Sequence, residues 1–470
     1  APLVSREMID AFHLPALADP PTTPRAYGAG ADAFTLRIPQ LRPEDLRRQI
    51  DALLAARERH LAHRPVAEIV AVVDRAAARL LDPGDPLRAT AEHALPAVTG
   101  YSPAMTRLVL DRMAADWRAG PLTTLLRAEF GDPEVLDGFR PGPDARTLRA
   151  AFGPRLAVHV FSGNVPGVAV TSLVRSLLVK AATLGKTAAG EPLLAPLFAR
   201  AVAEEDAGLG ACLAVTYWPG GAEALERAAL EAADAVVAYG GAEAVASVRA
   251  RTPPRARFLA YGPRLSFAAV GRDRLTRAEA PALARDAALD AAIFDQQGCV
   301  SPHLFYVEEG GEVGPREWAA LLAAAMEQVE RELPRGPLAP GESAAIHQLR
   351  GEAEFASGAV LHASPGGTAW TVVYDPDPAF AASCLNRVVR VKPVAALAEV
   401  PALLEAYASV LQTVGVAASP AAARALAAAL GRLGASRVAP LGRMAWPPPH
   451  WHHDGRPPLL DLVRWCDLEA

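Results

Sequence analysis

The chain of 470 residues exceeds the usual size of a single domain, so we expect two domains or one domain divided into lobes. Its 51% hydrophobic and 21% charged residues are ordinary for a globular protein with a large core. A net charge of −5, without a basic stripe that carries interleaved aromatic residues, argues against nucleic acid as a main partner.

The N-terminal third has a helical pattern. Amphipathic runs cover Leu41–His63, Val66–Leu81 and Ser102–Ala119, and a Pro-Gly-Pro breaker follows at residues 141–143. The sequence therefore predicts a mostly helical region over residues 1–150.

The hydrophobic period changes at Arg155, and strands then alternate with helices. We expect strands at residues 156–161, 181–188, 211–217 and 234–239, and helices at residues 168–180, 191–205, 222–232 and 242–251. This alternation is typical of a doubly wound parallel sheet with helices on both faces. The longest apolar run, Val165–Val179, is interrupted by Arg175 and is too short to span a bilayer. Because the N-terminus lacks a basic-then-apolar signal pattern, we expect a cytoplasmic protein without a membrane span.

A second alternating block follows Tyr261-Gly262-Pro263. We expect helices at residues 285–294, 315–333 and 396–407, and strands at residues 304–307, 359–362, 370–374, 388–394 and 411–417. Residues 447–465 gather prolines, histidines and aromatic residues, which predicts a loop-like C-terminal tail.

Residues 162–167 form a turn between a predicted strand and a predicted helix, the place where open α/β sheets bind ligands. Asn164 would lie near the carboxyl end of the strand, and its uncharged amide suits an oxyanion. The alternative is a turn residue that only stabilises its own backbone.

Two further strand ends carry residues suited to a nucleotide. Lys186 and Thr187 end a strand before a helix, which suits a grip on a ribose or a phosphate. Gly240-Gly241 would let backbone N–H groups approach a pyrophosphate, although any tight turn also needs glycine. Only three of the 47 basic residues are lysines, at positions 180, 186 and 392. In a chain so rich in arginine, a lysine that remains indicates a position where a compact ammonium is needed. The alternative is that these three lysines remain by chance.

Cys299 lies between Gly298 and small or turn-forming residues. Gly298 removes a side chain that would shield the sulfur, and Pro302 ends any helix that starts here. A thiol presented in this way can attack an acyl carbonyl and carry the acyl group as a thioester, whereas a packed core cysteine is the alternative. We interpret the other cysteines as core or incidental residues, and their spacing predicts no metal site and fits a reducing compartment: Cys212, Cys384 and Cys466.

The order of Asn164 turn, Lys186 segment, Gly240-Gly241 turn and Cys299 resembles the aldehyde dehydrogenase superfamily. It is most similar to the branch of acyl-CoA reductases of the bacterial bioluminescence type (LuxC-like). The segments that carry this resemblance cover most of the chain from about residue 95 onward: 99–102, 158–167, 176–187, 294–302, 387–393, 413–415 and 451–465.

The resemblance implies an aldehyde-dehydrogenase-like α/β fold. It would comprise a helical N-terminal region packed on the cofactor domain (1–150), a Rossmann-type NADP(H)-binding domain (151–262), a catalytic domain (263–440) and a C-terminal tail (441–470). Cys299 would be the nucleophile and Asn164 the oxyanion donor. The cofactor would bind at Ser162, Gly163, Lys186, Thr187, Gly240, Gly241, Tyr261 and Gly262.

Two departures from the wider superfamily set the expected chemistry. Oxidising members carry a water-activating glutamate in a segment that corresponds here to residues 259–264, which hold no carboxylate. Ala189 stands where NAD-preferring members often carry a glutamate against the ribose. We therefore expect NADPH-dependent reduction of an acyl thioester to an aldehyde, unless Glu352, Glu354 or Asp454 folds into the site as a base.

The expected substrate is an acyl thioester of CoA or of a carrier protein, an acyl-transferring enzyme is a possible partner, and we expect a homo-oligomer. A CoA-independent aldehyde dehydrogenase would share the fold but run toward acids. A cysteine acyltransferase or thioesterase would pair Cys299 with a histidine of the segment Trp451–Arg456 and would not need Lys186. We interpret that segment as a packed lid or dimer contact, with a proton-shuttling histidine as the alternative.

Overall fold

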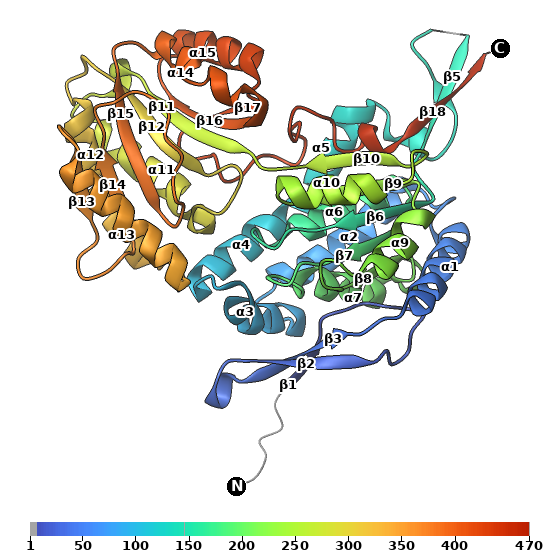
Figure 1. The fold of residues 1–470 in the computed structure, drawn as a ribbon. Helices are drawn as coiled ribbons and strands as arrows, with labels where there is room; N and C mark the ends of the chain where they lie inside the picture. Colours follow the sequence, from blue (N-terminus) through green and yellow to red (C-terminus); the bar gives the residue numbers. More distant parts are fainter. Residues whose placement is uncertain (1–6, 145, 470) are drawn as a thin grey trace.

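One parallel sheet and one mostly parallel sheet form the two lobes of the molecule, and a short connection after β10 joins them (Figure 1). The computed structural model describes residues 7–144 and 146–469. No helix among these described residues is both long enough and apolar enough to cross a membrane.

The sheet of the first lobe has five parallel strands, in the order β10 (Arg257–Tyr261), β9 (Ala235–Tyr239), β6 (Leu156–Val160), β7 (Ala182–Lys186), β8 (Leu213–Thr216). Its helices are α6 (Val168–Leu178), α7 (Leu194–Glu205), α8 (Ala207–Gly210), α9 (Glu223–Ala232) and α10 (Ala242–Arg251). The central strands β6 and β9 are buried and mostly apolar, as expected for strands covered by helices on both faces, although β6 also contains His159. The predicted strands and helices of this lobe are confirmed, with ends shifted by one to three residues.

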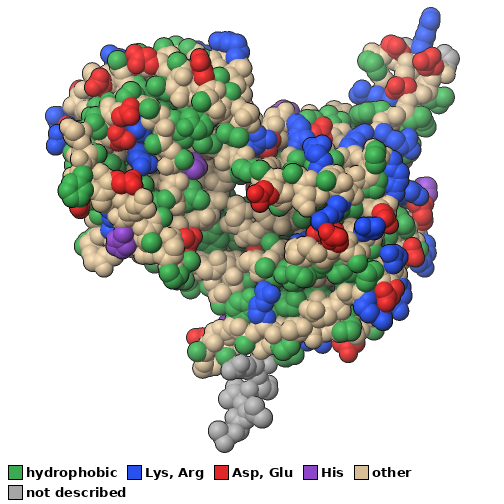
Figure 2. Space-filling model, viewed as in Figure 1, with side chains coloured by type: hydrophobic (Ala, Val, Ile, Leu, Met, Phe, Trp, Pro, Cys, Tyr) green, Lys and Arg blue, Asp and Glu red, His purple; other side chains and the backbone are tan. Residues whose placement is uncertain are grey.

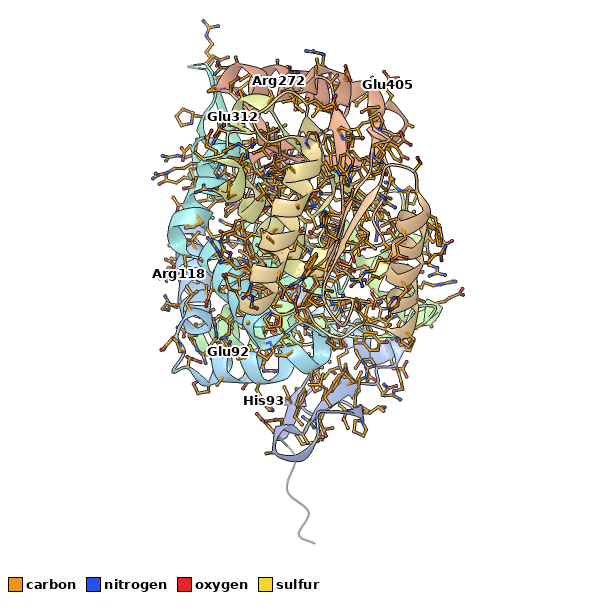
Figure 3. The ribbon with its side chains drawn as sticks, turned by 90° about the vertical axis from the view of Figure 1, so that its left-hand side faces the viewer. Glu92, His93, Arg118, Arg272, Glu312 and Glu405 are labelled. Atoms are coloured by element: carbon orange, nitrogen blue, oxygen red, sulfur yellow. The ribbon has the colours of Figure 1, made fainter. Side chains whose placement is uncertain are left out.

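The sheet of the second lobe has seven strands, in the order β13 (Val360–Ala363), β14 (Thr371–Tyr374), β15 (Val388–Val394), β12 (Pro302–Glu308), β11 (Leu265–Val270), β16 (Leu411–Ala417), β17 (Arg437–Pro440). All neighbours are parallel except β13 and β14. The helices are α11 (Ala280–Ala292), α12 (Pro315–Glu332), α13 (Pro340–Phe355), α14 (Val400–Leu403) and α15 (Pro420–Leu433). Figure 3 looks onto this lobe, with Arg272, Glu312 and Glu405 at its upper end and Glu92 and His93 of the helical region below.

The predicted helix at 396–407 is wrong, because the segment breaks into short pieces around α14. Pro401 has no N–H to continue a helix begun at 396. The short 3-10 helices of the chain are η1 (Gly30–Asp32), η2 (Pro133–Leu136), η3 (Arg272–Arg274), η4 (Ile293–Gln296), η5 (Leu397–Glu399), η6 (Glu405–Val410) and η7 (Leu460–Leu462).

The helical region consists of α1 (Pro43–His60), α2 (Val66–Leu81), α3 (Pro86–Thr99), α4 (Pro103–Asp116) and α5 (Ala119–Phe130). One hydrophobic core joins residues of α2, α4 and α5 to residues of α6 and α7, so this region packs on the first lobe. The N-terminal end of this region differs from the prediction that residues 1–150 are mostly helical. Residues 7–39 contain a three-stranded sheet in the order β1 (Glu7–Asp10), β3 (Phe34–Pro39), β2 (Thr22–Tyr27). The edge strand β2 has no apolar alternation and is fixed by its pairing with β3.

The C-terminal tail crosses back to the first lobe and ends in a strand. β18 (Arg464–Glu469) pairs with β5 (Thr147–Phe152), which also pairs with β4 (Arg140–Pro141), and the three form an arm that projects from the lobe (Figure 1). The expectation of a loop-like tail therefore holds for residues 447–459, which contain no helix or strand, but not for the C-terminal end.

Candidate active site

A cleft between the lobes runs along the carboxyl ends of β6, β9 and β10, and the molecule is visibly hollowed there (Figure 2). We call this hollow the nucleotide-side cavity. The turns that follow the three strands line it on one side, and the Cys299 loop lines it on the other. Of the predicted site residues, those in the cavity wall are Ser162, Gly163, Asn164, Gly240, Gly241, Tyr261, Gly262 and Cys299.

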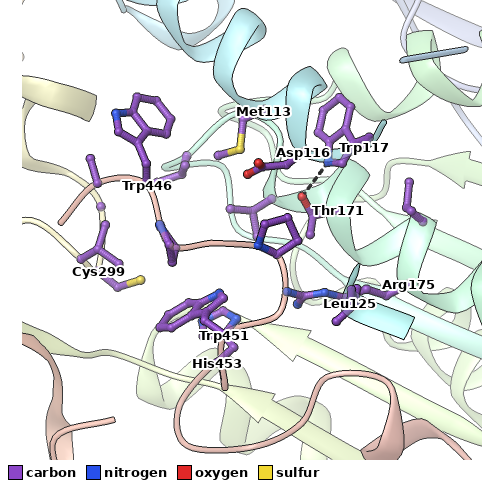
Figure 4. Close-up of a pocket in the computed structure, with 18 of the residues that line it drawn as sticks. Met113, Asp116, Trp117, Leu125, Thr171, Arg175, Cys299, Trp446, Trp451 and His453 are labelled. Carbon is purple, nitrogen blue, oxygen red and sulfur yellow. Dashed lines mark hydrogen bonds between the residues drawn. The ribbon is translucent and has the colours of Figure 1, made fainter. Parts of the chain in front are cut away.

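A second cavity lies on the opposite side of Cys299, between α4, α5, α6 and the tail; we call it the apolar cavity (Figure 4). Its wall is mostly hydrophobic and includes Trp117, Leu122, Leu125, Trp446 and Trp451. The Trp117 indole donates a hydrogen bond to Thr171 Oγ1 at 2.9 Å, which removes its polar atom from the wall. Burial raises the pKa of Asp116 in this wall to about 6, against the opposing charge of Arg112.

The loop before Cys299 has a strained backbone that sequence patterns did not indicate. Phe294, Asp295 and Gln296 all have φ between 49° and 66°, the left-handed region that side chains other than glycine rarely adopt. The predicted helix at 285–294 therefore ends with α11 at Ala292. A Cβ at Gly298 would lie 3.0 Å from the Phe294 ring, so glycine lets the loop close over that ring as well as expose the sulfur.

A facing segment holds this loop in place. Residues 385–387 are also left-handed. Arg387, only 1% exposed, donates to Asp295 Oδ1 at 2.8 Å, and Gln296 hydrogen-bonds both the N–H and the carbonyl of Val388. Interlocked polar contacts of this kind fix the geometry of the loop that presents Cys299.

Cys299 is partly exposed as a residue, but burial raises the pKa of its thiol to about 11, so the thiol form dominates at neutral pH. A side-chain hydrogen bond from Gln412 opposes the shift, and the negative charge of Asp454 adds to it. Ser266 donates to the Cys299 carbonyl at 2.6 Å and fixes the backbone. Attack by this sulfur needs a group that removes its proton.

Asn164 reaches the cysteine loop from the end of β6. Its Nδ2 donates to the Gln297 carbonyl at 3.0 Å, and its Oδ1 accepts from Ser162 at 2.8 Å. The Tyr101 hydroxyl donates to the Asn164 carbonyl at 2.6 Å and lies 3.2 Å from the Phe294 carbonyl, so it ties both segments together. Sequence analysis marked Tyr101 only as a member of the segment 99–102 and did not predict these contacts.

Lys186 and Thr187 stand at the same sheet edge but outside the cavity wall. Burial lowers the pKa of Lys186, opposed by the charge of Glu226. Thr187 is buried and donates through N–H and hydroxyl to the Thr216 carbonyl, so its contacts serve β8. Arg25, on β2, donates to the Ala189 carbonyl at 3.3 Å, beside the segment expected to meet the ribose. Sequence reasoning missed Arg25 because its strand was not predicted.

The other two lysines serve the fold. Lys180 Nζ donates to Asp137 at 2.7 Å, and Lys392 Nζ donates to Asp375 at 2.6 Å; both lysines are buried. Two of the three retained lysines therefore form buried ion pairs within the fold, and the role of Lys186 at the cofactor stays a prediction.

The tail brings a histidine and a carboxylate to Cys299. The His453 ring is stacked between Tyr261, at 4.3 Å between centroids, and Trp451, at 4.7 Å. Asp454, 1% exposed, accepts from Gln412 at 2.7 Å and lies 2.9 Å from Arg264 Nε. Glu352 and Glu354 are exposed on α13 and line neither cavity. Of the three carboxylates considered as a base from elsewhere in the chain, Asp454 is the one beside the nucleophile.

A family model of acyl-CoA reductases (LuxC) matches residues 61–465, which is most of the chain. The protein belongs to the LuxC family of acyl-CoA reductases. This confirms the resemblance inferred from its motifs and assigns the chain to the oxidoreductases that convert acyl thioesters to aldehydes.

Curated relatives and solved structures agree with the family. The chain is 27% identical over 380 residues to a long-chain acyl-protein thioester reductase of Aliivibrio fischeri, with 79% of this chain and 75% of the relative covered. It is 26% identical to that of Photobacterium phosphoreum, with 79% and 74% covered. Aldehyde dehydrogenase 21 of Physcomitrella patens, solved with succinate, matches with a TM-score of 0.75 at 15% identity, with 99% and 98% covered. The aldehyde-dehydrogenase-like fold is thereby confirmed.

Proposed function

We propose that this acyl-CoA reductase uses NADPH to reduce a long-chain acyl thioester through an acyl group carried on Cys299. The observation that carries the proposal is the position of Cys299 in the walls of both cavities. An acyl chain in the apolar cavity and a dinucleotide in the nucleotide-side cavity would meet at its sulfur.

The lining of the apolar cavity supports a hydrocarbon chain as substrate. Its indole, leucine and valine side chains would gain free energy by burying methylene groups, about 0.8 kcal/mol for each one. The named relatives act on long-chain acyl-protein thioesters, which supports an acyl chain delivered by a protein and loaded by an acyl-transferring partner.

Asn164 and the Cys299 N–H are the proposed oxyanion donors. An amide nitrogen has two hydrogens, and the Gln297 carbonyl accepts one of those on Asn164. The second can point to the developing negative charge on the acyl oxygen. Stabilisation of that charge in a partly enclosed site is worth several kcal/mol of activation free energy, on the order of 3 kcal/mol per donor.

The first sheet supports the cofactor assignment. The turns after β6 and β9 flank the point where the strand order reverses, which is where doubly wound sheets bind nucleotides. A side chain at Gly163 would lie 3.1 Å from the Glu191 N–H, so the glycine allows the 188–191 loop to approach. We propose that Lys186 holds the ribose and that Arg25 takes the 2′-phosphate, because Ala189 offers no carboxylate. When bound, NADPH supplies the hydride.

The second candidate function is that of an aldehyde dehydrogenase that releases a carboxylic acid, and the position of Asp454 is the observation that favours it. A carboxylate near the acyl-enzyme could activate water as the missing glutamate does in oxidising enzymes. Two contacts argue against this use: Gln412 occupies Oδ1, and Arg264 lies against Oδ2. We therefore propose that the acyl-enzyme resists water and waits for hydride.

Cys299→Ala tests the proposal. It should abolish acyl-enzyme formation and lower turnover on the order of 10³-fold or more, because the variant has no nucleophile. Intact mass spectrometry after mixing with acyl-CoA should show one acyl adduct on the wild type and none on the variant. Cys466→Ala, which removes an exposed thiol on β18, is the control and should keep the adduct. An adduct that survives in Cys299→Ala would contradict the proposal.

A further inference from the structure

The two cavities meet at a small set of residues that line both of them: Val165, Val168, Tyr239, Gly298, Cys299 and His453. If the acyl chain enters from one cavity and the reductant from the other, bonds can change only at this junction. Three side chains there can exchange a proton, those of Tyr239, Cys299 and His453. For Cys299 to react, either Tyr239 or His453 has to accept the proton of its thiol.

Proton transfer is unavoidable in the first half of the reaction. The Cys299 proton must leave as the sulfur attacks, and the departing thiolate must be protonated to leave as a thiol. Burial of the Cys299 thiol raises its pKa, so the free thiolate is scarce at neutral pH and the proton must be removed during attack.

Tyr239 cannot accept this proton. Burial raises the pKa of its phenol, which keeps the group neutral, and its hydroxyl donates to Ser172 at 3.1 Å. Asp454 lines neither cavity, and its two oxygens face Gln412 and Arg264. The imidazole of His453 is the remaining acceptor at the junction.

His453 is held as a neutral base. Tyr261 and Trp451 clamp the ring on its two faces, and Figure 4 shows His453 and Trp451 beside the Cys299 sulfur. Burial lowers its pKa well below 6.5, and the charges of Arg175, Arg264 and Arg456 lower it further. The one facing carboxylate, Asp454, lies 4.0 Å from Nε2 and is paired with Arg264. The same arginines would make the imidazolium a strong acid, quick to give the proton up.

We propose that His453 is a catalytic residue that carries the Cys299 proton to the departing thiol. As the Sγ–carbon bond forms, the imidazole accepts the thiol proton. As the bond from the acyl carbon to the departing sulfur breaks, that sulfur takes the electron pair and then the proton from the imidazolium. The products are the Cys299 thioester, a free thiol and neutral His453.

The second half needs one proton from water. When bound, the nicotinamide reductant would supply the hydride that reduces the acyl carbon. The bond from that carbon to Sγ would break with its electrons on sulfur. The aldehyde leaves, and the Cys299 thiolate takes a proton from water by way of His453. This step rests on the proposed function, since it assumes an acyl group on Cys299.

His453→Gln tests the assignment, because glutamine keeps hydrogen-bonding capacity but cannot carry a proton at neutral pH. His452→Gln is the control, since His452 is exposed and lines neither cavity. Acyl-enzyme formation would be followed by quenched-flow mass spectrometry with two thioesters of one acyl chain, an alkyl thioester (acyl-CoA) and a nitrophenyl thioester. The nitrophenyl thiolate is stable without protonation.

We expect His453→Gln to slow acylation by acyl-CoA at least tenfold more than acylation by the nitrophenyl thioester. His452→Gln should match the wild type with both. An equal loss with both thioesters would mean that His453 does not give a proton to the departing thiol, and no loss with either would exclude any role; both results overturn the proposal. Failure of the wild type to form an adduct at Cys299 would instead contradict the proposed function, so the two failures are distinguishable.

Discussion

At the scale of single residues, the proposed cofactor site would use two cations that come from different parts of the chain. Lys186 ends β7, whereas Arg25 reaches Ala189 from the N-terminal sheet. An ammonium at the ribose would serve either nicotinamide cofactor. A guanidinium at the 2′-phosphate would serve only NADPH, because NADH has no phosphate at this position. The guanidinium can bind that phosphate through two parallel hydrogen bonds.

Lys186→Met should therefore weaken NADPH and NADH alike, by about 1.5–3 kcal/mol if one charge-assisted hydrogen bond is lost. Arg25→Ala should weaken NADPH by a similar amount and leave NADH unchanged. Calorimetric titration of each cofactor measures both effects without turnover. Arg47→Ala, an exposed arginine on α1, is the control. Equal loss of both cofactors in Arg25→Ala would show that this arginine does not contact the 2′-phosphate.

Residue by residue, the sequence predicted the groups that directly follow predicted strands or helices and missed those that reach the site from other parts of the chain. Asn164, Cys299 and the glycines follow predicted strands or helices and were found from local spacing. Tyr101 and Arg25 act through long-range contacts that no local pattern encodes. The interpretation of the segment Trp451–Arg456 as a packed structural element covers only part of what the structure shows. His453 packs in an aromatic stack, as that interpretation expects, and it also lines both cavities.

At the scale of elements, the strand–turn–helix that carries Asn164 is fastened by a buried histidine. His159 on β6 makes hydrogen bonds from its two ring nitrogens to Ser172 and Ser176 on α6, at 2.8 and 2.7 Å. Burial lowers its pKa to about 3. The bond pattern holds the helix against the strand on either side of the 162–167 turn.

This histidine predicts acid sensitivity of the fold. The unfolded chain binds a proton below pH 6.5 and the native state does not until about pH 3, so stability falls as the pH drops through that window. The contribution is about 1.4 kcal/mol per pH unit, or about 2 kcal/mol between pH 6.5 and pH 5. Urea denaturation at these two pH values should show a smaller acid loss in His159→Gln than in the wild type. An identical loss in both proteins would remove His159 as the cause.

Regular alternation made four strands of the first sheet predictable, because strands buried on both faces are mostly apolar. The edge strand β10, which is only partly buried, was not predicted. The unpredicted parts depend on partners. β2 has no apolar alternation and forms by pairing with β3, and β18 forms by pairing with β5. The left-handed residues 294–296 carry ordinary side chains, and their conformation follows from contacts with Arg387 and Val388, about ninety residues away.

At the scale of the whole molecule, the arm of β4, β5 and β18 is the feature that a single copy leaves unexplained. It projects from the first lobe with exposed apolar side chains at Leu148, Phe152, Trp465 and Leu468 (Figure 1). Leu468 is 48% exposed. Apolar side chains gathered on a projecting sheet favour burial against another copy of the chain.

We expect a homo-oligomer assembled through this arm. The double variant Leu148→Asp and Leu468→Asp should dissociate it, because each carboxylate would have to lose its hydration in an apolar contact. Sedimentation velocity measures the change in mass. The pair Glu7→Ala and Glu399→Ala, exposed elsewhere, is the control. A wild type that sediments as a monomer, or a double variant that keeps the wild-type mass, would contradict the arm as interface.

The proposed reaction requires that the acyl-enzyme at Cys299 gives its acyl group to hydride and not to water. Two observations support this fate: residues 259–264 hold no carboxylate, and Gln412 and Arg264 lie against the two oxygens of Asp454. A single-turnover experiment tests it most directly. The enzyme is loaded with radiolabelled acyl-CoA without NADPH, free acid is followed over time, and NADPH is then added. We predict a long-lived acyl-enzyme that NADPH discharges to aldehyde, in the wild type and in Asp454→Asn. Acid released without NADPH as fast as aldehyde forms with it, and slowed by Asp454→Asn, would show that Asp454 activates water and that the protein works as an acid-forming enzyme.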